Sequence, residues 1–353
     1  MDGKLYEVCK FREEIWWLNS MNQKVLETIR KYNLIVDGDK IVLGVSGGPD
    51  SICMLDNLRE VKEEQIIEFE IYVAHINHMI REEAIDDEKY VQEYCKKYNI
   101  ECFVKRADVQ KIASEKKIGT EEAGRKVRYD FFEEVLQKTE SNKIAIAHNK
   151  NDKIETIIMH LLRGSGLSGL KGIEPIRDNK YIRPLLECER TEIEQYCEDK
   201  KLNPRIDKTN FENEYTRNKI RNIVIPYIKK EFNPNIIQTL SRLSDLAADE
   251  SNYIELQTQK AFEKILIAKE KEQITLNLKE FNKQDKVIKN RLILYTTKEL
   301  MGSTQGIETI HIEDIIKLCQ NNVGNKFLTP NKNLKVLVKD KKIFFIKQNT
   351  YKN

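Results

Sequence analysis

A short apolar run followed by a glycine-rich turn restricts the possible folds of this chain more than any other segment. Residues 40–45 read Lys-Ile-Val-Leu-Gly-Val, which is typical of a buried β-strand, and a helical pattern begins at Ile52. Between them, residues 45–51 read Val-Ser-Gly-Gly-Pro-Asp-Ser. A strand, a glycine turn and a helix in this order point backbone N–H groups and the positive end of a helix dipole at one spot. The segment therefore predicts an α/β fold with a phosphate site at this turn.

The side chains of the turn favour a pyrophosphate over a single phosphate. Gly47 and Gly48 allow positive φ angles and a close approach of the backbone to an anion. Ser46 and Ser51 can add hydroxyl donors. A site for a bare phosphate would not call for a carboxylate. The presence of Asp50 in the turn therefore predicts a magnesium ion that bridges this carboxylate and a pyrophosphate. The turn has neither the Walker pattern nor the Gly-x-Gly-x-x-Gly pattern. The alternative is a turn that only caps a helix.

Alternating strands and helices predict a doubly wound, mostly parallel, Rossmann-like sheet. The expected strands are Ile41–Val45, Glu68–Ile76, Glu101–Lys105 and Lys143–His148. The expected helices are Ile52–Val61, Glu83–Tyr98, Glu121–Thr139 and Lys153–Leu162. Ligands of such sheets bind beyond the carboxyl ends of the strands, where the glycine turn, His75 and His148 all fall.

The pattern changes after Pro234 and predicts a second, smaller α+β domain. The expected elements are a helix from Asn235 to about Lys271, a strand at Ile274–Leu278, helices at Lys286–Leu300 and Ile312–Cys319, and strands at Lys326–Thr329, Leu334–Lys339 and Ile343–Lys347. The predicted organisation is therefore an N-terminal extension (1–20), a catalytic α/β domain (21–233) and a C-terminal domain (234–353).

The charge distribution is uneven although the formal net charge is only +3. Residues 215–230 hold five basic side chains and no acidic one, and residues 326–353 hold eight lysines against Asp340 alone. Two such zones favour a polyanionic partner, and a solvated lysine-rich surface is the alternative for either zone.

The cysteines indicate a reducing compartment. The chain has seven, an odd number, and none forms a Cys-x-x-Cys pair, so zinc and iron–sulfur sites have little support. The sequence shows no signal peptide and no apolar run of membrane length. We therefore expect a cytoplasmic protein with reduced thiols and no membrane partner.

A second polar cluster follows the second expected strand, where residues 75–81 read His-Ile-Asn-His-Met-Ile-Arg. Strand alternation puts His75 and Asn77 on one face. Two histidines and an arginine past a strand end can hold a phosphate or a carboxylate. The alternative is a structural role, with His78 in a turn.

A third cluster lies at the start of the expected helix Glu121–Thr139. Thr120 is the expected N-cap, and Glu121, Arg125 and Arg128 share a helix face. The functional interpretation is a pair of arginines that meets phosphates and a glutamate that meets an ammonium group. The alternative is a surface helix with ion pairs.

A fourth cluster follows His148, at the end of the last expected strand of the α/β domain. Asp152 and Glu155 are three residues apart at a helix start, so both carboxylates can face one site and hold Mg²⁺. Capping of the helix is the alternative for Asp152. The glycine-rich segment 163–169 can close over a substrate.

The fifth cluster is Arg217 and Arg221, four residues apart on one helix face, with Asn218 and Lys219 alongside. These side chains can grip an RNA backbone, and a solvated helix is the alternative.

The turn at Ser46–Ser51 resembles the Ser-Gly-Gly-x-Asp-Ser loop of the PP-loop ATP pyrophosphatases. Taken in order, the five clusters, together with Arg183-Pro184-Leu185-Leu186, resemble the tRNA(Ile)-lysidine synthetase family from about Met21 to the C-terminal strands. The chain ends soon after the lysine-rich strands, so the resemblance predicts a form without the additional C-terminal domain of longer members.

The resemblance implies a two-step reaction. ATP adenylates the C2 oxygen of the wobble cytidine in a CAU-anticodon isoleucine tRNA and releases pyrophosphate. The ε-amine of L-lysine then displaces AMP, and a carboxylate or His148 takes its proton. The implied cofactors are ATP and Mg²⁺, the implied partners are tRNA(Ile) and lysine, and a homodimer is possible. The C-terminal domain is expected to bind tRNA.

The resemblance also implies roles for individual residues. The residues expected in catalysis are Asp50, His148, Asp152 and Arg125. Those expected at ATP are Ser46, Gly47, Gly48, Pro49, Asp50, Ser51, Ala74 and His75. Those expected at lysine or tRNA are Glu121, Arg128, Arg163, Arg217 and Arg221. The expected magnesium ligands are Asp50, Asp152 and Glu155.

Two positions of the fourth cluster depart from the family pattern, which usually reads His-His-x-Asp-Asp there, and Gly124 of the third cluster stands where the family often has alanine. Asn149 and Asn151 replace the second histidine and the first aspartate, and an asparagine cannot act as a base. This departure keeps open a non-catalytic tRNA- or nucleotide-binding protein. Another alternative is a PP-loop enzyme that thiolates a tRNA base. It would need a persulfide or cluster cysteine, and the absence of a Cys-x-x-Cys pair counts against it.

Overall fold

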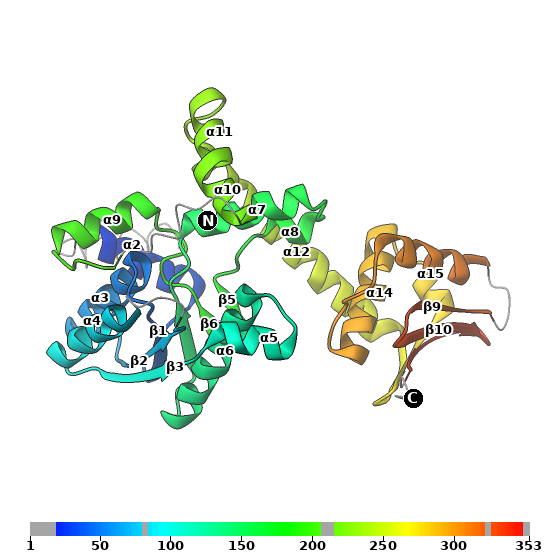
Figure 1. The fold of residues 1–353 in the computed structure, drawn as a ribbon. Helices are drawn as coiled ribbons and strands as arrows, with labels where there is room; N and C mark the ends of the chain where they lie inside the picture. The colour runs from blue at the N-terminus through cyan, green and yellow to red at the C-terminus, as the bar shows by residue number, and fades with distance from the viewer. Residues whose placement is uncertain (1–18, 80–83, 206–214, 322–325, 349–353) are drawn as a thin grey trace. The chain divides into compact units, whose positions relative to one another are not determined.

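The computed structural model describes residues 19–79, 84–205, 215–321 and 326–348 (Figure 1). Arg81 and nearly all of the expected N-terminal extension lie outside the described residues. The chain forms two compact units, Met1–Asp245 and Leu246–Asn353. The boundary thus falls inside a long helix, α12 (Ile236–Ile265), whereas the sequence places it at residues 233–234.

The first unit is built on a six-stranded sheet whose strand order is β3-β2-β1-β4-β6-β5. The strands are β1 (Asp39–Gly44), β2 (Phe69–Asn77), β3 (Glu101–Arg106), β4 (Lys143–Ile146), β5 (Ile176–Arg177) and β6 (Tyr181–Ile182). All neighbours are parallel except β5 and β6. The chain moves from β1 to β2 and β3, and then returns to the other side of β1. The predicted doubly wound α/β fold is confirmed, and its switch point lies beside the carboxyl end of β1.

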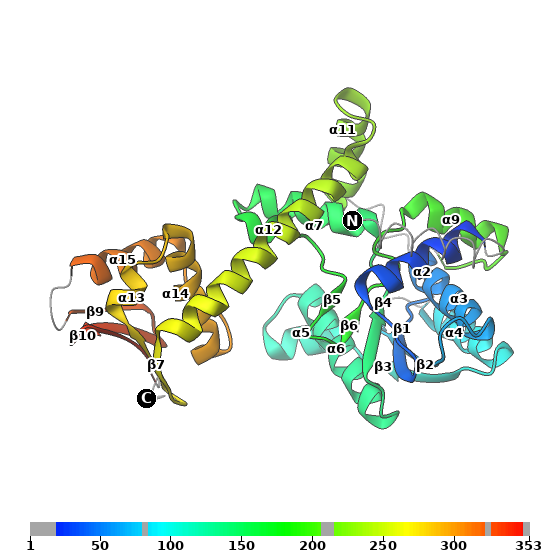
Figure 2. The same cartoon turned by 180° about the vertical axis from the view of Figure 1, so that it is seen from behind.

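Helices cover both faces of this sheet (Figures 1 and 2). Helices on one face are α2 (Ser20–Tyr32), α3 (Pro49–Glu63), α4 (Ala84–Lys97) and α9 (Arg190–Asp199), and those on the other are α5 (Val109–Lys116) and α6 (Thr120–Lys138). Side chains alternate along β1, so Ile41 and Leu43 pack into the core between the sheet and α2, α3, α4 and α9. Val42 points to the opposite face and packs with Phe132 of α6. A Cβ on Gly44 would lie 2.4 Å from Cζ of Phe132, so this position has room only for glycine.

A further helical layer positions the fourth and fifth clusters against each other. It contains α7 (Lys150–Leu162), α8 (Leu167–Leu170), α10 (Thr216–Lys219), the π-helical turn η2 (Ile220–Val224), α11 (Ile225–Glu231) and the start of α12. Ile154 and Ile157 of α7 pack with Ile220 and Ile225. The helix widens into its π turn just before Pro226, which has no N–H to donate. This apolar contact brings Arg217 and its neighbours beside α7.

The second unit is the predicted α+β domain. Its antiparallel sheet has the order β7-β8-β11-β10-β9, formed by β7 (Leu266–Lys269), β8 (Gln273–Asn277), β9 (Lys326–Asn331), β10 (Leu334–Lys339) and β11 (Lys342–Lys347). Its helices, besides most of α12, are α13 (Leu278–Asn282), α14 (Lys286–Met301) and α15 (Thr309–Asn321). The prediction that a helix continues to Lys271 is wrong, because residues 266–269 pair with β8 instead. No helix within the described ranges is both long and apolar enough to cross a membrane.

Candidate active site

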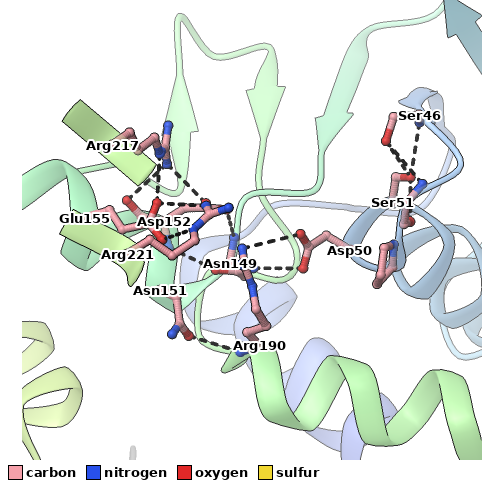
Figure 3. A network of polar contacts seen from close by, with 12 residues as sticks. Ser46, Asp50, Ser51, Asn149, Asn151, Asp152, Glu155, Arg190, Arg217 and Arg221 are labelled. Carbon is pink, nitrogen blue, oxygen red and sulfur yellow. Dashed lines mark hydrogen bonds and ion pairs between the residues drawn. The ribbon is translucent and has the colours of Figure 1, made fainter. Parts of the chain in front are cut away.

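The glycine turn joins β1 to α3 and is held in shape by one hydroxyl group. Gly47 has φ +94°, a conformation that favours glycine. Oγ of Ser51 accepts the N–H groups of Ser46 at 3.1 Å and Gly47 at 3.2 Å, and it donates to the carbonyl of Gly48 at 3.0 Å (Figure 3). Ser51 therefore orders the turn from inside, in addition to the expected role at the phosphate.

Two residues of β2 hold the start of the turn. The carbonyl of Ala74 accepts the N–H of Val45 at 3.1 Å, and Nδ1 of His75 donates to the carbonyl of Val45 at 2.8 Å. Burial lowers the pKa of His75, so the ring is neutral. Both residues lie beside the turn at the carboxyl end of a strand, as expected. A contact with ATP stays a prediction for each.

Asp50 stands in the first turn of α3 and faces α7 (Figure 3). Its Oδ1 accepts a hydrogen bond from Nδ2 of Asn149 at 2.8 Å, and Nη2 of Arg190 lies 4.0 Å from its Oδ2. Burial, and then the negative charge of Asp152, raise the pKa of Asp50 to about 6. The nearest positive charge in the described part of the chain, on Arg190, is 4.0 Å from this carboxylate, so much of its negative charge is not neutralised. Such a carboxylate is suited to bind a magnesium ion that also contacts phosphate oxygens.

Asn149 connects Asp50 to the start of α7. Its Oδ1 accepts the N–H of Asp152 at 2.9 Å, and the carboxylate of Asp152 accepts the N–H of Asn149 at 3.0 Å. This reciprocal pair is a capping box, so the alternative interpretation of Asp152 as a helix cap holds. The same fully buried amide donates to Asp50. Asn149 therefore orients two carboxylates without exchanging a proton.

Asn151 makes a second connection, to α9. Its Oδ1 accepts the N–H of Arg190 at 3.0 Å, at the first residue of that helix. This bond fixes the helix end that carries the Arg190 side chain toward Asp50. Both asparagines that depart from the family pattern thus serve as hydrogen-bonding connectors between helices.

Two arginines and two carboxylates form a charge network on the side of Asn149 away from Asp50 (Figure 3). Arg217 donates to Glu155 at 2.8 Å and to Asp152 at 3.1 Å. Arg221 donates to Glu155 at 2.6 and 2.9 Å and to Asp152 at 3.2 Å. Glu155 is only 1% exposed. The spacing that predicts a shared face is confirmed for both arginines, but their charged groups turn inward.

This network bears on the expected magnesium ligands. Both oxygens of Glu155 are occupied by guanidinium groups, so Glu155 does not fit a metal ion. Within the described parts of the chain, no three His, Cys, Asp or Glu side chains gather as a metal-binding group. The expected trio of Asp50, Asp152 and Glu155 is therefore not assembled, and the fit to Mg²⁺ rests on Asp50.

His148 lies just past β4 and accepts a hydrogen bond at Nδ1 from Nε of Arg183, at 3.1 Å. Burial, and then the positive charges of Arg183 and Arg217, lower the pKa of His148 to about 3. The ring is neutral at pH 7 and very weakly basic, which argues against the expected role as a base. Arg183 is absent from the expected site residues, although it directly follows the short strand β6 in a family-like Arg-Pro-Leu-Leu segment.

A pocket of about 320 Å³ opens beside His148. We call it the arginine pocket because five arginines line it. Its lining is Arg125, His148, Thr156, Met159, His160, Arg163, Gly172, Ile173, Glu174, Arg177, Arg183 and Arg217. It brings together the predicted Arg125, Arg163 and Arg217. Glu121 and Arg128 are exposed on α6 and do not line it, and Gly119 instead of Thr120 is the N-cap of that helix.

Residues 18–228 match the family model described as the PP-loop domain. Over 312 residues the chain is 47% identical to a protein named tRNA(Ile)-lysidine synthase from Clostridioides difficile, a match that covers 88% of this chain and 67% of the relative. The chain belongs to the tRNA(Ile)-lysidine synthase family. A relative of the same name from Clostridium acetobutylicum shows the same identity and coverage.

Membership in the tRNA(Ile)-lysidine synthase family confirms the predicted resemblance, and the chain spans about two thirds of the length of these relatives. Among solved structures, the U34-tRNA thiolase NcsA from Methanococcus maripaludis with its [4Fe-4S] cluster matches with a TM-score of 0.54 and 20% identity, over 65% of this chain and 78% of that one. At this identity the likeness shows the fold alone.

Proposed function

We propose that this chain uses ATP to join lysine to C2 of the wobble cytidine in a CAU-anticodon isoleucine tRNA, by way of an adenylated tRNA. The family assigns the enzyme class, an ATP-dependent ligase that forms lysidine in tRNA(Ile). The observation that carries the proposal is the placement of Asp50. It stands between the glycine turn and α7, at the switch point of a family-matched sheet.

The first step is supported by the turn and by Asp50. Backbone N–H groups of residues 46–48 and the start of α3 would bind the pyrophosphate as negative charge develops on it. Asp50 would hold Mg²⁺, which would neutralise part of that charge. Contacts from Asn149 and Arg190 to the carboxylate of Asp50 support this role, because they restrict its position.

The second step needs a lysine amine without its extra proton. His148 is poorly suited to remove that proton, because its pKa is about 3. A carboxylate that does not hold Mg²⁺ is the better candidate, because binding of the ion keeps the carboxylate of Asp50 from taking up a proton. The target is a base in a single-stranded loop, which suits recognition of an unstacked nucleotide.

The remaining assignments extend the proposal. The exposed Lys219 and Lys230 of the basic zone at residues 215–230 and the basic zone at residues 326–353 would contact the tRNA backbone. Glu121, Arg128 and Arg163 would contact tRNA or lysine. The reaction would take place in the cytoplasm, and the enzyme would act as a homodimer if two copies are needed to hold one tRNA.

The test is transfer of labelled lysine to a CAU-anticodon transcript in the presence of ATP and Mg²⁺. We expect ATP-dependent incorporation and none into a transcript with a different anticodon. Asp50→Ala should abolish transfer while circular dichroism shows an intact fold. Folded protein that binds the transcript but incorporates no lysine would support the non-catalytic alternative and refute the proposal.

A further inference from the structure

The hydrogen bond between Arg183 and His148 fixes which ring nitrogen of the histidine carries the proton. A guanidinium N–H can only donate, so Nδ1 of His148 must accept. The neutral ring then carries its proton on Nε2 and offers a hydrogen-bond donor there. Arg183 is only 4% exposed and also donates through Nη1 to the carbonyl of Glu174. The buried Arg183, fixed by its bond to Glu174, therefore fixes the N–H donor at Nε2 of His148.

The arginine pocket beside this donor is strongly positive. Its only lining carboxylate, Glu174, lies 3.6 Å from the ammonium group of Lys171. Arg125 and Arg163 form no ion pair with another described residue. The pocket thus has charge available for an anionic ligand, and its volume of about 320 Å³ lies at the lower end of the range for small-ligand sites.

Aromatic rings pack against two of the guanidinium groups. The guanidinium of Arg125 lies 4.9 Å from the ring centroid of Tyr129. That of Arg177 lies 5.0 Å from Tyr129 and 4.4 Å from Tyr181. Guanidinium groups can also stack on an unpaired base, which is a common mode of recognition for single-stranded RNA.

We propose that the arginine pocket receives the target cytidylate of the RNA, and that Arg183 is a positioning residue that fixes His148 as a hydrogen-bond donor to N3 of the cytosine. Arg125 and Arg163 would meet the phosphate of this nucleotide. This inference rests on the proposed function and adds the site and the side chains that select the base.

A hydrogen-bond donor fixed at Nε2 of His148 would distinguish cytosine from uracil. N3 of cytosine is an acceptor and pairs with a donor, whereas N3 of uracil carries a hydrogen and would face the N–H of His148. Two buried donors that face each other leave both without a partner, which disfavours uracil. A histidine free to move its proton to Nδ1 would accept from uracil and lose this selectivity.

The test compares two short anticodon stem-loop RNAs, one with C and one with U at the wobble position, in binding to the full chain. We expect the wild type to bind the C-containing RNA roughly tenfold more tightly in fluorescence anisotropy, because this ratio corresponds to the free energy of about one hydrogen bond. Arg183→Gln should reduce this preference to about twofold, mainly by weakening the C-containing RNA. The charge-matched control, Arg242→Gln on α12, should weaken both RNAs equally and keep the preference.

Two further measurements keep the proposal testable if Arg183→Gln folds poorly. His148→Gln retains an amide donor and should keep the preference for C, whereas His148→Ala should lose it. Nitrogen-15 NMR of the wild type should show His148 protonated at Nε2 and not at Nδ1 from pH 5 to 8. A ring protonated at Nδ1, or an equal affinity of wild type for both RNAs, would overturn the proposal.

The outcomes also separate this inference from the proposed function. Preference for C that depends on Arg183, without lysine transfer, would refute the ligase activity and leave the pocket assignment standing. Lysine transfer with an unchanged preference in Arg183→Gln would refute the pocket assignment alone. ATP binding, measured separately by calorimetry, should be the same in Arg183→Gln and wild type. Loss of ATP binding in that variant would count against a pocket for the nucleotide of the RNA.

Discussion

Replacing Asn149 with alanine tests the connection between α3 and α7 most directly. The side chain is fully buried and makes two hydrogen bonds, one that caps α7 and one that reaches Asp50 on α3. Alanine removes both and leaves the N–H of Asp152 without its partner. We therefore expect Asn149→Ala to lose stability and, because Asp50 loses its orientation, to lose lysine transfer.

The magnitude follows from the two bonds. Loss of an N-cap costs about 1 kcal/mol, and loss of a hydrogen bond to a charged group costs about 1.5–3 kcal/mol. We expect the free energy of unfolding to fall by roughly 2.5–4 kcal/mol in total. Displacement of a carboxylate by about 1 Å can cost about 100-fold in rate, so lysine transfer should fall by about two orders of magnitude.

Asn19→Ala is a matched control in the same unit. Asn19 is also an N-cap, with its Oδ1 accepting the N–H of Asn22 at 2.9 Å, but its amide lies 3.5 Å from Glu60. Glu60 keeps a stronger bond from Asn22 at 2.7 Å. This variant should lose only the cap contribution, about 1 kcal/mol, and keep its activity.

The assay is urea unfolding followed by circular dichroism, with lysine transfer measured on the same preparations. Equal losses of stability in Asn149→Ala and Asn19→Ala would show that the bond to Asp50 contributes nothing measurable. Full activity in Asn149→Ala would show that Asp50 does not depend on this bond for its position. Either result would refute the reasoning.

Three further perturbations test neighbouring contacts. Asn149→Asp keeps an acceptor for the helix but puts a carboxylate against Asp50, so the pKa of Asp50 should rise above 6 and transfer should recover as pH is raised from 7 to 8.5. Glu155→Ala leaves two inward-facing guanidinium groups without this carboxylate and should cost about 3 kcal/mol in urea unfolding. The pKa of His148 is lowered to about 3, so its contribution to stability is present above pH 6.5 and is lost as pH falls toward 3. Unfolding of His148→Gln should depend less on pH across that window.

Much of the fold follows from local pattern. The strand, glycine turn and helix at residues 39–63 and the alternation after them are set by neighbours in sequence, and the structure confirms them. The error at β7 has a different origin. Residues 266–269 continue a helical pattern, but pairing with β8 and the core beneath that strand override it.

Less of the site could be predicted from the sequence, because its contacts join segments that are far apart in the chain. The spacing of Asp152 and Glu155 and that of Arg217 and Arg221 each predict a shared face, but neither shows that the two faces meet. Arg190 gives no local signal, since its place near Asp50 depends on how α9 packs and on the bond from its N–H to Asn151.

The asparagine at position 149 shows what that position requires. The side chain at this position must accept one hydrogen bond, which caps α7, and donate one hydrogen bond, which reaches Asp50. A neutral histidine, the usual family residue, also carries one acceptor and one donor, so both side chains can supply this pair of functions. Only the histidine could also exchange a proton. A chain with Asn149 that transfers lysine would therefore show that residue 149 serves to orient Asp50, and that the proton of lysine leaves by way of another group.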